Sequence, residues 1–400
     1  MILGVLAACA VAPVPPVISG APAPPTAPMA TPAPSAALPT PQPQPTSPTE
    51  AAAPPPVGSA PGASILQPRS RWVASSWLDL PGWTSDRPSE LWPALLRGCE
   101  RPAAGWAMLC AQARAAVASG NASSDDATRA WLEKRLQPYR IEAHEGGSDG
   151  LITGYFEPLV EASRTPRNGF RHALHTPPSD LGSKTPYWSR RQFDTLPAAQ
   201  ASLRGRELAY LADPLDALML QVQGSGRLSI VGTDGKRKLV RVAYAGHNDL
   251  PYQSIGRWLI DQGELRAGEA SWPAIRLWAK NNPKRINELL WANPRVVFFR
   301  EEPLPDPQLG PRGAQAVPLT PQRSVAVDPQ SIPYGTALWL DTTEPLSNSP
   351  LRRIVMAQDT GSAIVGAVRA DFFWGWGDEA EAQAGRMKQT LRMWALWPKT

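Results

Sequence analysis

The first 68 residues of this 400-residue chain nearly lack charge and wholly lack tryptophan. Glu50 is their single charged side chain, none of the 16 tryptophans lies among them, and residues 11–70 hold 19 of the 46 prolines. A segment with so few large apolar side chains cannot bury a core, and its prolines keep it extended. We therefore predict a disordered tether over residues 1–68. Residues 69–400 remain for folding, which is enough for two medium domains.

The chain also lacks an apolar run of about 18 residues, which excludes a transmembrane bundle. Its 40 Lys and Arg against 35 Asp and Glu leave a net charge of +5. The basic residues are scattered and form no stripe, so nothing indicates nucleic acid as a partner. A diffuse positive charge suits an acidic polymer equally well.

Several catalytic signatures are missing. We find no Gly-x-Ser-x-Gly elbow, no P-loop, no dinucleotide fingerprint and no zinc-ligand spacing, and the four histidines form no ligand cluster. We therefore expect no metal and no cofactor. Carboxyl groups are the remaining candidates for acid and base chemistry.

The three cysteines divide into a single residue and a pair. Cys9 ends the run Leu6-Ala7-Ala8-Cys9, which resembles a bacterial lipobox, although no basic residue precedes the short apolar start. The alternatives for Cys9 are lipidation or a chance cysteine. Cys99 and Cys110 are an even pair, which predicts a disulfide in an exported protein; the alternative is two buried thiols.

Apolar spacing and turn residues predict helices followed by many short strands. Helices are expected at 92–97, 105–118, 124–136, 254–265, 272–280, 282–291 and 378–387. Strands are expected at 151–156, 217–223, 227–231, 238–244, 295–299, 324–327, 337–340, 353–357 and 392–397, with a hairpin turn at 233–235. Short strands joined by glycine and proline turns predict a small barrel in the last hundred residues.

Three aspartates lie near apolar runs of this C-terminal region. Each of Asp328, Asp359 and Asp371 follows an apolar, strand-like run, and four aromatic residues lie within the five positions after Asp371. A closed barrel could bring all three to one rim. Aromatic walls desolvate a carboxyl group and raise its pKa, as a general acid near neutral pH requires. The alternative is that the aspartates cap turns and the aromatic residues form core.

Five ordered blocks of sequence give the chain a family resemblance. It resembles the membrane-bound lytic murein transglycosylase A family in the residues Thr153-Gly-Tyr-Phe-Glu-Pro158, Gln221-Val-Gln-Gly-Ser-Gly226, Tyr244-Ala-Gly-His-Asn248 with Ser254-Ile-Gly-Arg257, Asn293-Pro294 with Val297-Phe-Phe-Arg-Glu301, and the three-aspartate stretch. The blocks span about 72–399.

The resemblance implies a mainly β fold with N-terminal and inserted helices. It implies a double-psi β-barrel domain from residues 69–163 and 304–400, an inserted second β domain over 164–303, and a substrate groove between them. It also implies a peptidoglycan lytic exotransglycosylase. Such an enzyme cleaves the β-1,4 bond between N-acetylmuramic acid and N-acetylglucosamine without water and leaves 1,6-anhydromuramic acid ends.

By motif match the catalytic residue is Asp371, acting first as acid and then as base. Asp359 matches a supporting aspartate of the groove, and Asp328 matches one that orders the barrel loop. Expected substrate-binding residues are Tyr155, Glu157, Gln221, Gln223 and Ser225. Gln221 and Gln223 would share one face of the expected strand, whereas Glu157 either binds a hydroxyl or structures its turn.

The expected partners are peptidoglycan glycan strands, together with wall-synthesis or wall-remodelling proteins. Membrane contact would occur only through the lipid anchor. The location would be the periplasmic face of the outer membrane of a Gram-negative bacterium, or the periplasm without lipidation of Cys9.

Two other functions fit the same residues. A non-catalytic protein that binds or loosens the wall could use the same barrel, because fold does not fix function. A hydrolytic muramidase could use Asp371 and Asp359 as a pair with water as the nucleophile.

Overall fold

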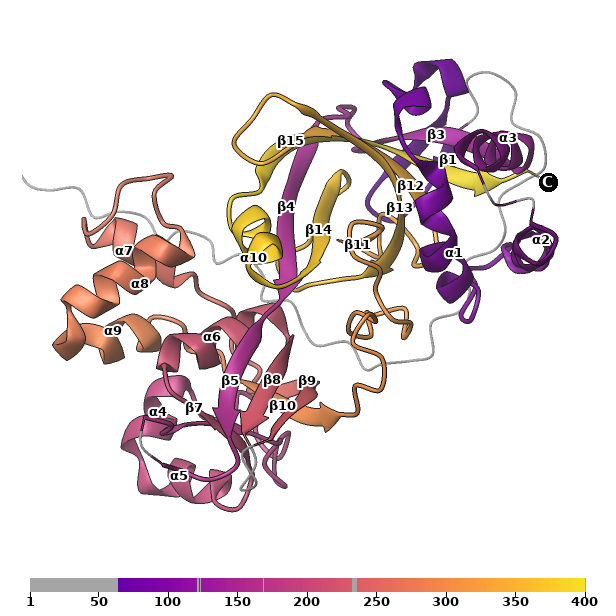
Figure 1. Ribbon diagram of the computed structural model, residues 1–400. Helices are drawn as coiled ribbons and strands as arrows, with labels where there is room; N and C mark the ends of the chain where they lie inside the picture. The colour runs from indigo at the N-terminus through magenta and orange to yellow at the C-terminus, as the bar shows by residue number, and fades with distance from the viewer. Residues whose placement is uncertain (1–63, 121, 123, 168, 232–235, 400) are drawn as a thin grey trace, which may run out of the picture. The chain divides into compact units, whose positions relative to one another are not determined.

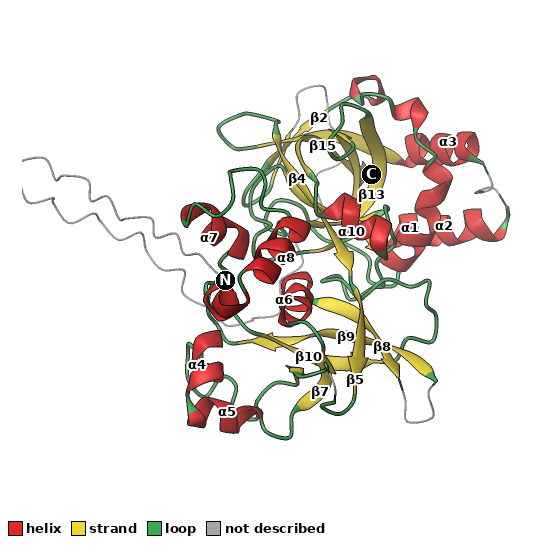
Figure 2. Cartoon of the chain, turned by 60° about the vertical axis from the view of Figure 1, so that its left-hand side comes forward, coloured by secondary structure: helices red, strands yellow, loops and turns green. Residues whose placement is uncertain are grey.

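The computed structural model of the protein describes residues 64–120, 122, 124–167, 169–231 and 236–399. In these residues the fold is mixed α/β with two sheets, one of nine strands and one of six (Figures 1 and 2). Cys9 and the predicted turn at 233–235 lie outside them. The first strand, β1 (Ser64–Leu66), pairs with β2 (Arg71–Ala74), so a strand begins within the segment predicted as tether.

The nine-stranded sheet carries Asp359 and Asp371, and Asp328 directly follows one of its strands. Its strand order is β1-β2-β3-β15-β12-β13-β11-β14-β4, and β15 also pairs with β4. The pairings from β15 through β12, β13, β11, β14 and β4 therefore return to β15 and form a closed ring. The remaining strands are β3 (Leu136–Glu142), β4 (Gly150–Glu157), β11 (Ser324–Val327), β12 (Ala337–Thr343), β13 (Pro350–Asp359), β14 (Arg369–Trp376) and β15 (Lys388–Pro398).

The six-stranded sheet is formed by the chain between β4 and β11. Its order is β10-β9-β8-β5-β7-β6. The strands are β5 (Leu159–Ser163), β6 (His172–His175), β7 (Glu207–Leu211), β8 (Ser225–Val231), β9 (Arg237–His247) and β10 (Val297–Glu302). Pro158 alone separates β4 from β5. Because β5 pairs with β7 and β8, the second sheet starts before the predicted boundary at residue 164.

Helices lie beside both sheets. In Figure 1, α1 (Trp92–Gly98), α2 (Ala107–Ala118) and α3 (Asp125–Arg135) lie near β3, whereas α7 (Ile255–Asp261), α8 (Trp272–Asn281) and α9 (Ile286–Trp291) are grouped near α6 (Pro214–Gln223). The others are α4 (Arg190–Thr195), α5 (Pro197–Leu203), α10 (Asp378–Ala384) and four 3-10 turns, η1 (Trp77–Asp79), η2 (Trp83–Ser85), η3 (Pro88–Leu91) and η4 (Pro283–Arg285).

The N-terminal helices share one core with the larger sheet. Trp72, Trp106 and Trp339 are fully buried in it. Trp72 and Trp397 pack edge to face with ring centroids 5.5 Å apart, a geometry that aromatic quadrupoles favour. The core therefore joins residues from both ends of the described chain and holds the strands that carry the aspartates.

The prediction of a strand at 217–223 was wrong, because this segment is the C-terminal part of α6. The Asp213 side chain accepts a hydrogen bond from the Leu215 backbone, Pro214 starts the helix, and Gly224 ends it in the left-handed conformation with φ 77°. These are strong start and stop signals for a helix. The apolar run looked like a strand because α6 contributes to two cores: Leu220 packs in that of the small sheet, and Leu218 in that of the helices.

Most other expected elements are confirmed, several with shifted ends. The strand at 324–327 has the predicted bounds, whereas the helix predicted at 254–265 ends at Asp261. The segment at 282–291 is the 3-10 turn η4 followed by α9, rather than one helix. Strands β1, β2, β3, β5, β6, β7 and β14 were not predicted. Of these, β14 matters most because it contains Asp371.

Cys99 and Cys110 are joined by a disulfide that links the end of α1 to α2, with Cα atoms 5.4 Å apart. We expect the double variant Cys99→Ser/Cys110→Ser to lose about 2–3 kcal/mol of unfolding free energy, because the bridge restricts the unfolded chain. Urea denaturation of the oxidised wild type, the reduced wild type and the variant measures this loss. Equal stability of the oxidised and reduced wild type would contradict it.

Candidate active site

Asp371 lies on β14 between two neighbouring strands. It is opposite Ala326 on β11 and opposite Thr153 on β4. The Thr153 hydroxyl donates a hydrogen bond of 2.6 Å to Asp371 Oδ1, and Arg369 Nη2 donates one of 2.9 Å to the Thr153 oxygen. One threonine therefore links the carboxyl group to a guanidinium.

The pKa of Asp371 is raised to about 6. Burial is the main cause, and the nearby charge of Asp359 adds to it. The hydrogen bond from Thr153 and the charge of Arg369 act in the opposite direction. A carboxyl group with this pKa can hold and release a proton near neutral pH, which is what proton transfer in catalysis requires.

Asp359 is the last residue of β13. It pairs with Ala326 of β11, the residue that Asp371 faces from the opposite edge of β11. Two strand spacings separate the backbones of Asp359 and Asp371, which is about 10 Å. The Tyr155 hydroxyl donates to Asp359 Oδ2 at 2.8 Å, and the Ala314 backbone donates to Oδ1 at 3.0 Å. Burial raises the pKa of Asp359 too. The sheet register thus brings two of the predicted aspartates to one site.

Asp328 has different surroundings. It is buried, its Oδ1 accepts from the Gln330 backbone and its Oδ2 from the Gly366 backbone, each at 2.9 Å. Arg69 Nε lies 3.6 Å from Oδ2. Both oxygens hold loop backbone in place, so Asp328 ties the loop after β11 to the loop before β14.

Gly154 gives β4 its close approach to β14. A Cβ atom at this position would lie 2.7 Å from the Trp374 indole nitrogen and 2.9 Å from the Ala384 Cα. Because a protein interior is close-packed, any larger residue would push β4 away from β14 and α10. The glycine beside Thr153 therefore keeps the threonine within reach of Asp371.

Only some of the predicted substrate-binding residues lie near the two aspartates. Tyr155 is beside Asp359, and its ring packs 5.2 Å from that of Phe373. Glu157 is fully buried, and Arg227 and Arg241 occupy both of its carboxylate oxygens at 2.7 and 2.5 Å. These contacts favour the structural alternative for Glu157.

Gln221 and Gln223 do not share a strand face. They lie on α6, where residues two apart point to different sides. Gln221 accepts a hydrogen bond from Arg190, and Gln223 accepts one from the Phe156 backbone at 3.2 Å. Ser225 starts β8. A cavity of about 230 Å³ brings Gln223 to Thr153, with Tyr252, Trp272 and Met387 also in its walls.

Thr153, Arg369 and the cavity residue Tyr252 were missed as site residues. Arg369 is two positions before Asp371, so the period of a strand places both on one side of β14. This spacing would have indicated Arg369 if a strand had been predicted at β14. Thr153 is the first residue of the motif Thr153–Pro158, but its partner Asp371 lies 218 positions away. Sequence periodicity does not indicate contacts between residues so far apart.

Comparison with known proteins decides the family. The chain is 33% identical over 275 residues to the membrane-bound lytic murein transglycosylase A of Escherichia coli K12, and the match covers 67% of this chain and 71% of the relative. The chain belongs to this family. The MltA-specific insert domain matches residues 151–300, and the 3D domain matches residues 323–397.

Solved structures of the MltA family have the same fold. The lytic transglycosylase LtgG of Burkholderia pseudomallei is 44% identical, with a TM-score of 0.59 over 86% of this chain and 100% of that one. Escherichia coli MltA with bound chitohexaose is 26% identical, with a TM-score of 0.65 over 85% and 95%. Within the described residues of this family member, no helix is long and apolar enough to cross a membrane.

Proposed function

We propose that this MltA-family chain cleaves the β-1,4 bond between N-acetylmuramic acid and N-acetylglucosamine in peptidoglycan and leaves a 1,6-anhydro end. The observation that carries the proposal is Asp371, desolvated, with a pKa of about 6 and a hydrogen bond from Thr153. The bound chitohexaose of the Escherichia coli relative supports a glycan substrate.

Asp371 acts twice in this reaction. Its proton moves to the glycosidic oxygen while the bond from that oxygen to the anomeric carbon breaks, and the leaving sugar keeps the electron pair. The muramic acid C6 hydroxyl then attacks the anomeric carbon, and its proton returns to Asp371. One carboxyl group is sufficient because the nucleophile belongs to the substrate and is already held near the reacting carbon. Ordinary glycosidases need two such groups.

Asp359 acts as a supporting acid. Its contact with Tyr155 fixes its position, and its charge adds to the burial that raises the pKa of Asp371. Gln223 and Tyr252 border the cavity next to Thr153, where an amide and an aromatic ring suit sugar hydroxyls and ring faces. We place the glycan groove there, between the ring of strands and the inserted sheet, and we propose that this ring is the double-psi barrel.

The product distinguishes the three candidate functions. We expect digestion of purified sacculi by the chain to release muropeptides with 1,6-anhydro ends, each lighter than a hydrolysed product by the mass of one water molecule, since water is not added. Mass spectrometry detects the difference. Reducing ends would indicate a hydrolytic muramidase, and absence of soluble products despite sacculus binding would indicate a wall-binding protein.

The pH dependence should follow Asp371. Because the acid acts in its protonated form, we expect kcat/KM to fall about tenfold per pH unit above pH 6. Thr153→Val removes a hydrogen bond that lowers the pKa of Asp371, so its alkaline limb should move to higher pH. Thr153→Ser keeps the hydroxyl and is the matched control. If the alkaline limb of the kcat/KM profile is the same in the wild type and in Thr153→Val, then the hydrogen bond from Thr153 does not set the pKa of the catalytic acid.

We also propose that Cys9 is lipidated, that the proline-rich segment up to about residue 63 is a tether, and that the chain acts at the periplasmic face of the outer membrane. If so, Cys9→Ser should move the protein from the membrane fraction to the soluble fraction without loss of activity on isolated glycan strands, because the tether carries almost no charge. Retention of Cys9→Ser in the membrane fraction would exclude the anchor.

A further inference from the structure

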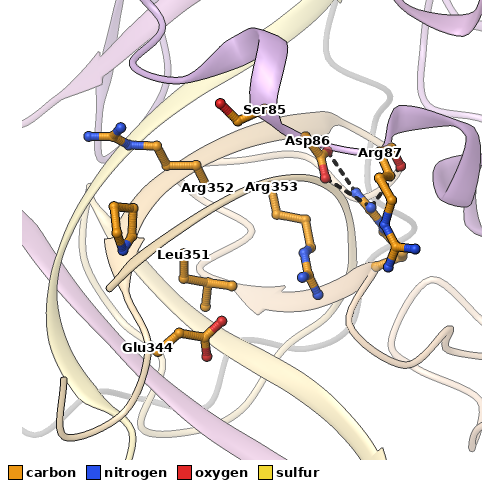
Figure 3. A pocket seen from close by; sticks show the side chains of 9 residues that line it. Ser85, Asp86, Arg87, Glu344, Leu351, Arg352 and Arg353 are labelled. Atoms are coloured by element: carbon orange, nitrogen blue, oxygen red, sulfur yellow. Dashed lines mark hydrogen bonds and ion pairs between the residues drawn. The ribbon is translucent and has the colours of Figure 1, made fainter. Parts of the chain in front are cut away.

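A second cavity, of about 290 Å³, is shown in Figure 3. It lies at the start of β13, whereas Asp359 is the last residue of that strand. Its walls come from the turn between η2 and η3, from the start of β13, and from Arg323 and Glu344. Asp359 is six positions along β13 from Arg353 in this cavity, a length of about 20 Å. The cavity is therefore distinct from the site around Asp371.

Four arginines line this cavity, and three of them are neutralised by carboxylates of the protein. These pairs are Arg323 with Asp86 at 2.8 Å, Arg87 with Glu90 at 2.6 Å, and Arg352 with Asp341 at 2.7 Å. The fourth is Arg353, which donates a hydrogen bond to the Gln322 side chain.

Arg353 and Glu344 are left as two opposite charges across the cavity. In the part of the chain that the structure describes, neither has an oppositely charged group within 4.0 Å. Both side chains are half-buried and line the same cavity (Figure 3). Burial raises the pKa of Glu344 and lowers that of Arg353, so each charge is less well solvated than it would be in water.

We propose that this cavity binds the zwitterionic end of an amino acid, with the ligand's carboxylate on Arg353 and its ammonium on Glu344. A simple anion fits less well because Glu344 would repel it. The volume is near the lower limit for small-ligand sites and suits a group of this size. The proposal rests on the proposed function for its source: the peptide stems of Gram-negative peptidoglycan carry diaminopimelate, whose free end has an ammonium and a carboxylate on one carbon.

Isothermal titration of the full chain with a stem tetrapeptide containing diaminopimelate tests the proposal. We expect saturable binding that is weakened about 10- to 100-fold by either Arg353→Gln or Glu344→Gln, because each removes a charge-assisted contact. Acetylation of the free ammonium of the peptide should weaken binding to the wild type but have no further effect on Glu344→Gln. Free diaminopimelate is titrated in parallel, and tighter binding of the tetrapeptide identifies the stem as the source.

Arg237→Gln is the matched control, since Arg237 forms an exposed pair with Glu161 on the other sheet. Thermal melts show that each variant is folded. Absence of tetrapeptide binding to the wild type, or binding that both cavity variants leave unchanged, overturns the inference. A chain that makes anhydro ends but binds no peptide refutes this inference alone, whereas a chain that binds peptide but cleaves no glycan refutes the proposed function.

Discussion

Asp371→Asn should abolish sacculus lysis while the protein remains folded. Asparagine has nearly the same shape as aspartic acid but cannot transfer the proton that both steps of the proposed reaction require. The loss of a general acid and base typically lowers the rate by about 10²–10⁴. Release of soluble muropeptides from labelled sacculi measures the loss.

Stability separates loss of chemistry from loss of fold. The pKa of Asp371 is raised to about 6 from 3.8, so its contribution to stability is fully present below the unfolded value and is lost as the pH rises through the folded value. Above pH 6 the native site holds an unfavourable carboxylate, and Asp371→Asn removes it. The variant should therefore melt at the same or a higher temperature than the wild type at pH 7.5.

Asp378→Asn is the control for Asp371→Asn. Asp378 is exposed at the start of α10, seven positions further along the chain, and the same substitution there should leave lysis intact. More than about a tenth of wild-type activity in Asp371→Asn would show that another group transfers the proton.

Glu157→Gln should destabilise the protein by about 3–5 kcal/mol, because removing one partner from a buried ion pair leaves the remaining charges uncompensated. Here two guanidiniums would be left, those of Arg227 and Arg241, which otherwise donate hydrogen bonds to the backbone carbonyls of Pro307 and Leu309. Denaturation of the wild type and the variant in guanidinium chloride gives the difference in unfolding free energy.

An exposed glutamate on the next strand provides the comparison. Glu161 on β5 pairs with Arg237, and both side chains are more than half exposed. Exposed pairs contribute about 0–1 kcal/mol, so Glu161→Gln should change little. If Glu157→Gln costs no more than Glu161→Gln yet raises KM, then Glu157 binds substrate and the structural role is wrong.

The sequence was informative where its signals are local. The strand at 324–327 and the helices at 92–97 and 124–136 could be predicted because apolar period, caps and turns act within a few residues. The motifs also indicated Asp359 and Asp371 before any fold was known. The segment at 217–223 was mispredicted because an apolar run that is buried on both sides has no periodicity that distinguishes a strand from a helix. The helix could have been recognised from its N-cap Asp213, from Pro214 at its start and from Gly224 at its end.

The long-range contacts in and near the candidate site could not be predicted from these local sequence patterns. Glu157 meets Arg227 and Arg241 from 70 and 84 positions away, and Asp371 meets Thr153 across 218. Opposite charges are common in any sequence, and only the fold selects which of them are neighbours. The sequence suggested that a barrel could gather the three aspartates, but only the strand register shows that Asp359 and Asp371 lie opposite Ala326 while Asp328 binds loop backbone.

The closed ring of pairings has a consequence for the timing of folding. Its strand β4 is made early, β11 to β14 follow some 170 residues later, and β15 closes the ring at the very end of the chain. Contacts this distant in sequence form slowly, because a long loop must close before they contribute. A growing chain that has not yet reached β15 therefore has no closed ring around its two aspartates. Among the described strands of the ring, the one made last is the one that closes it, so the ring cannot close before synthesis has passed residue 388.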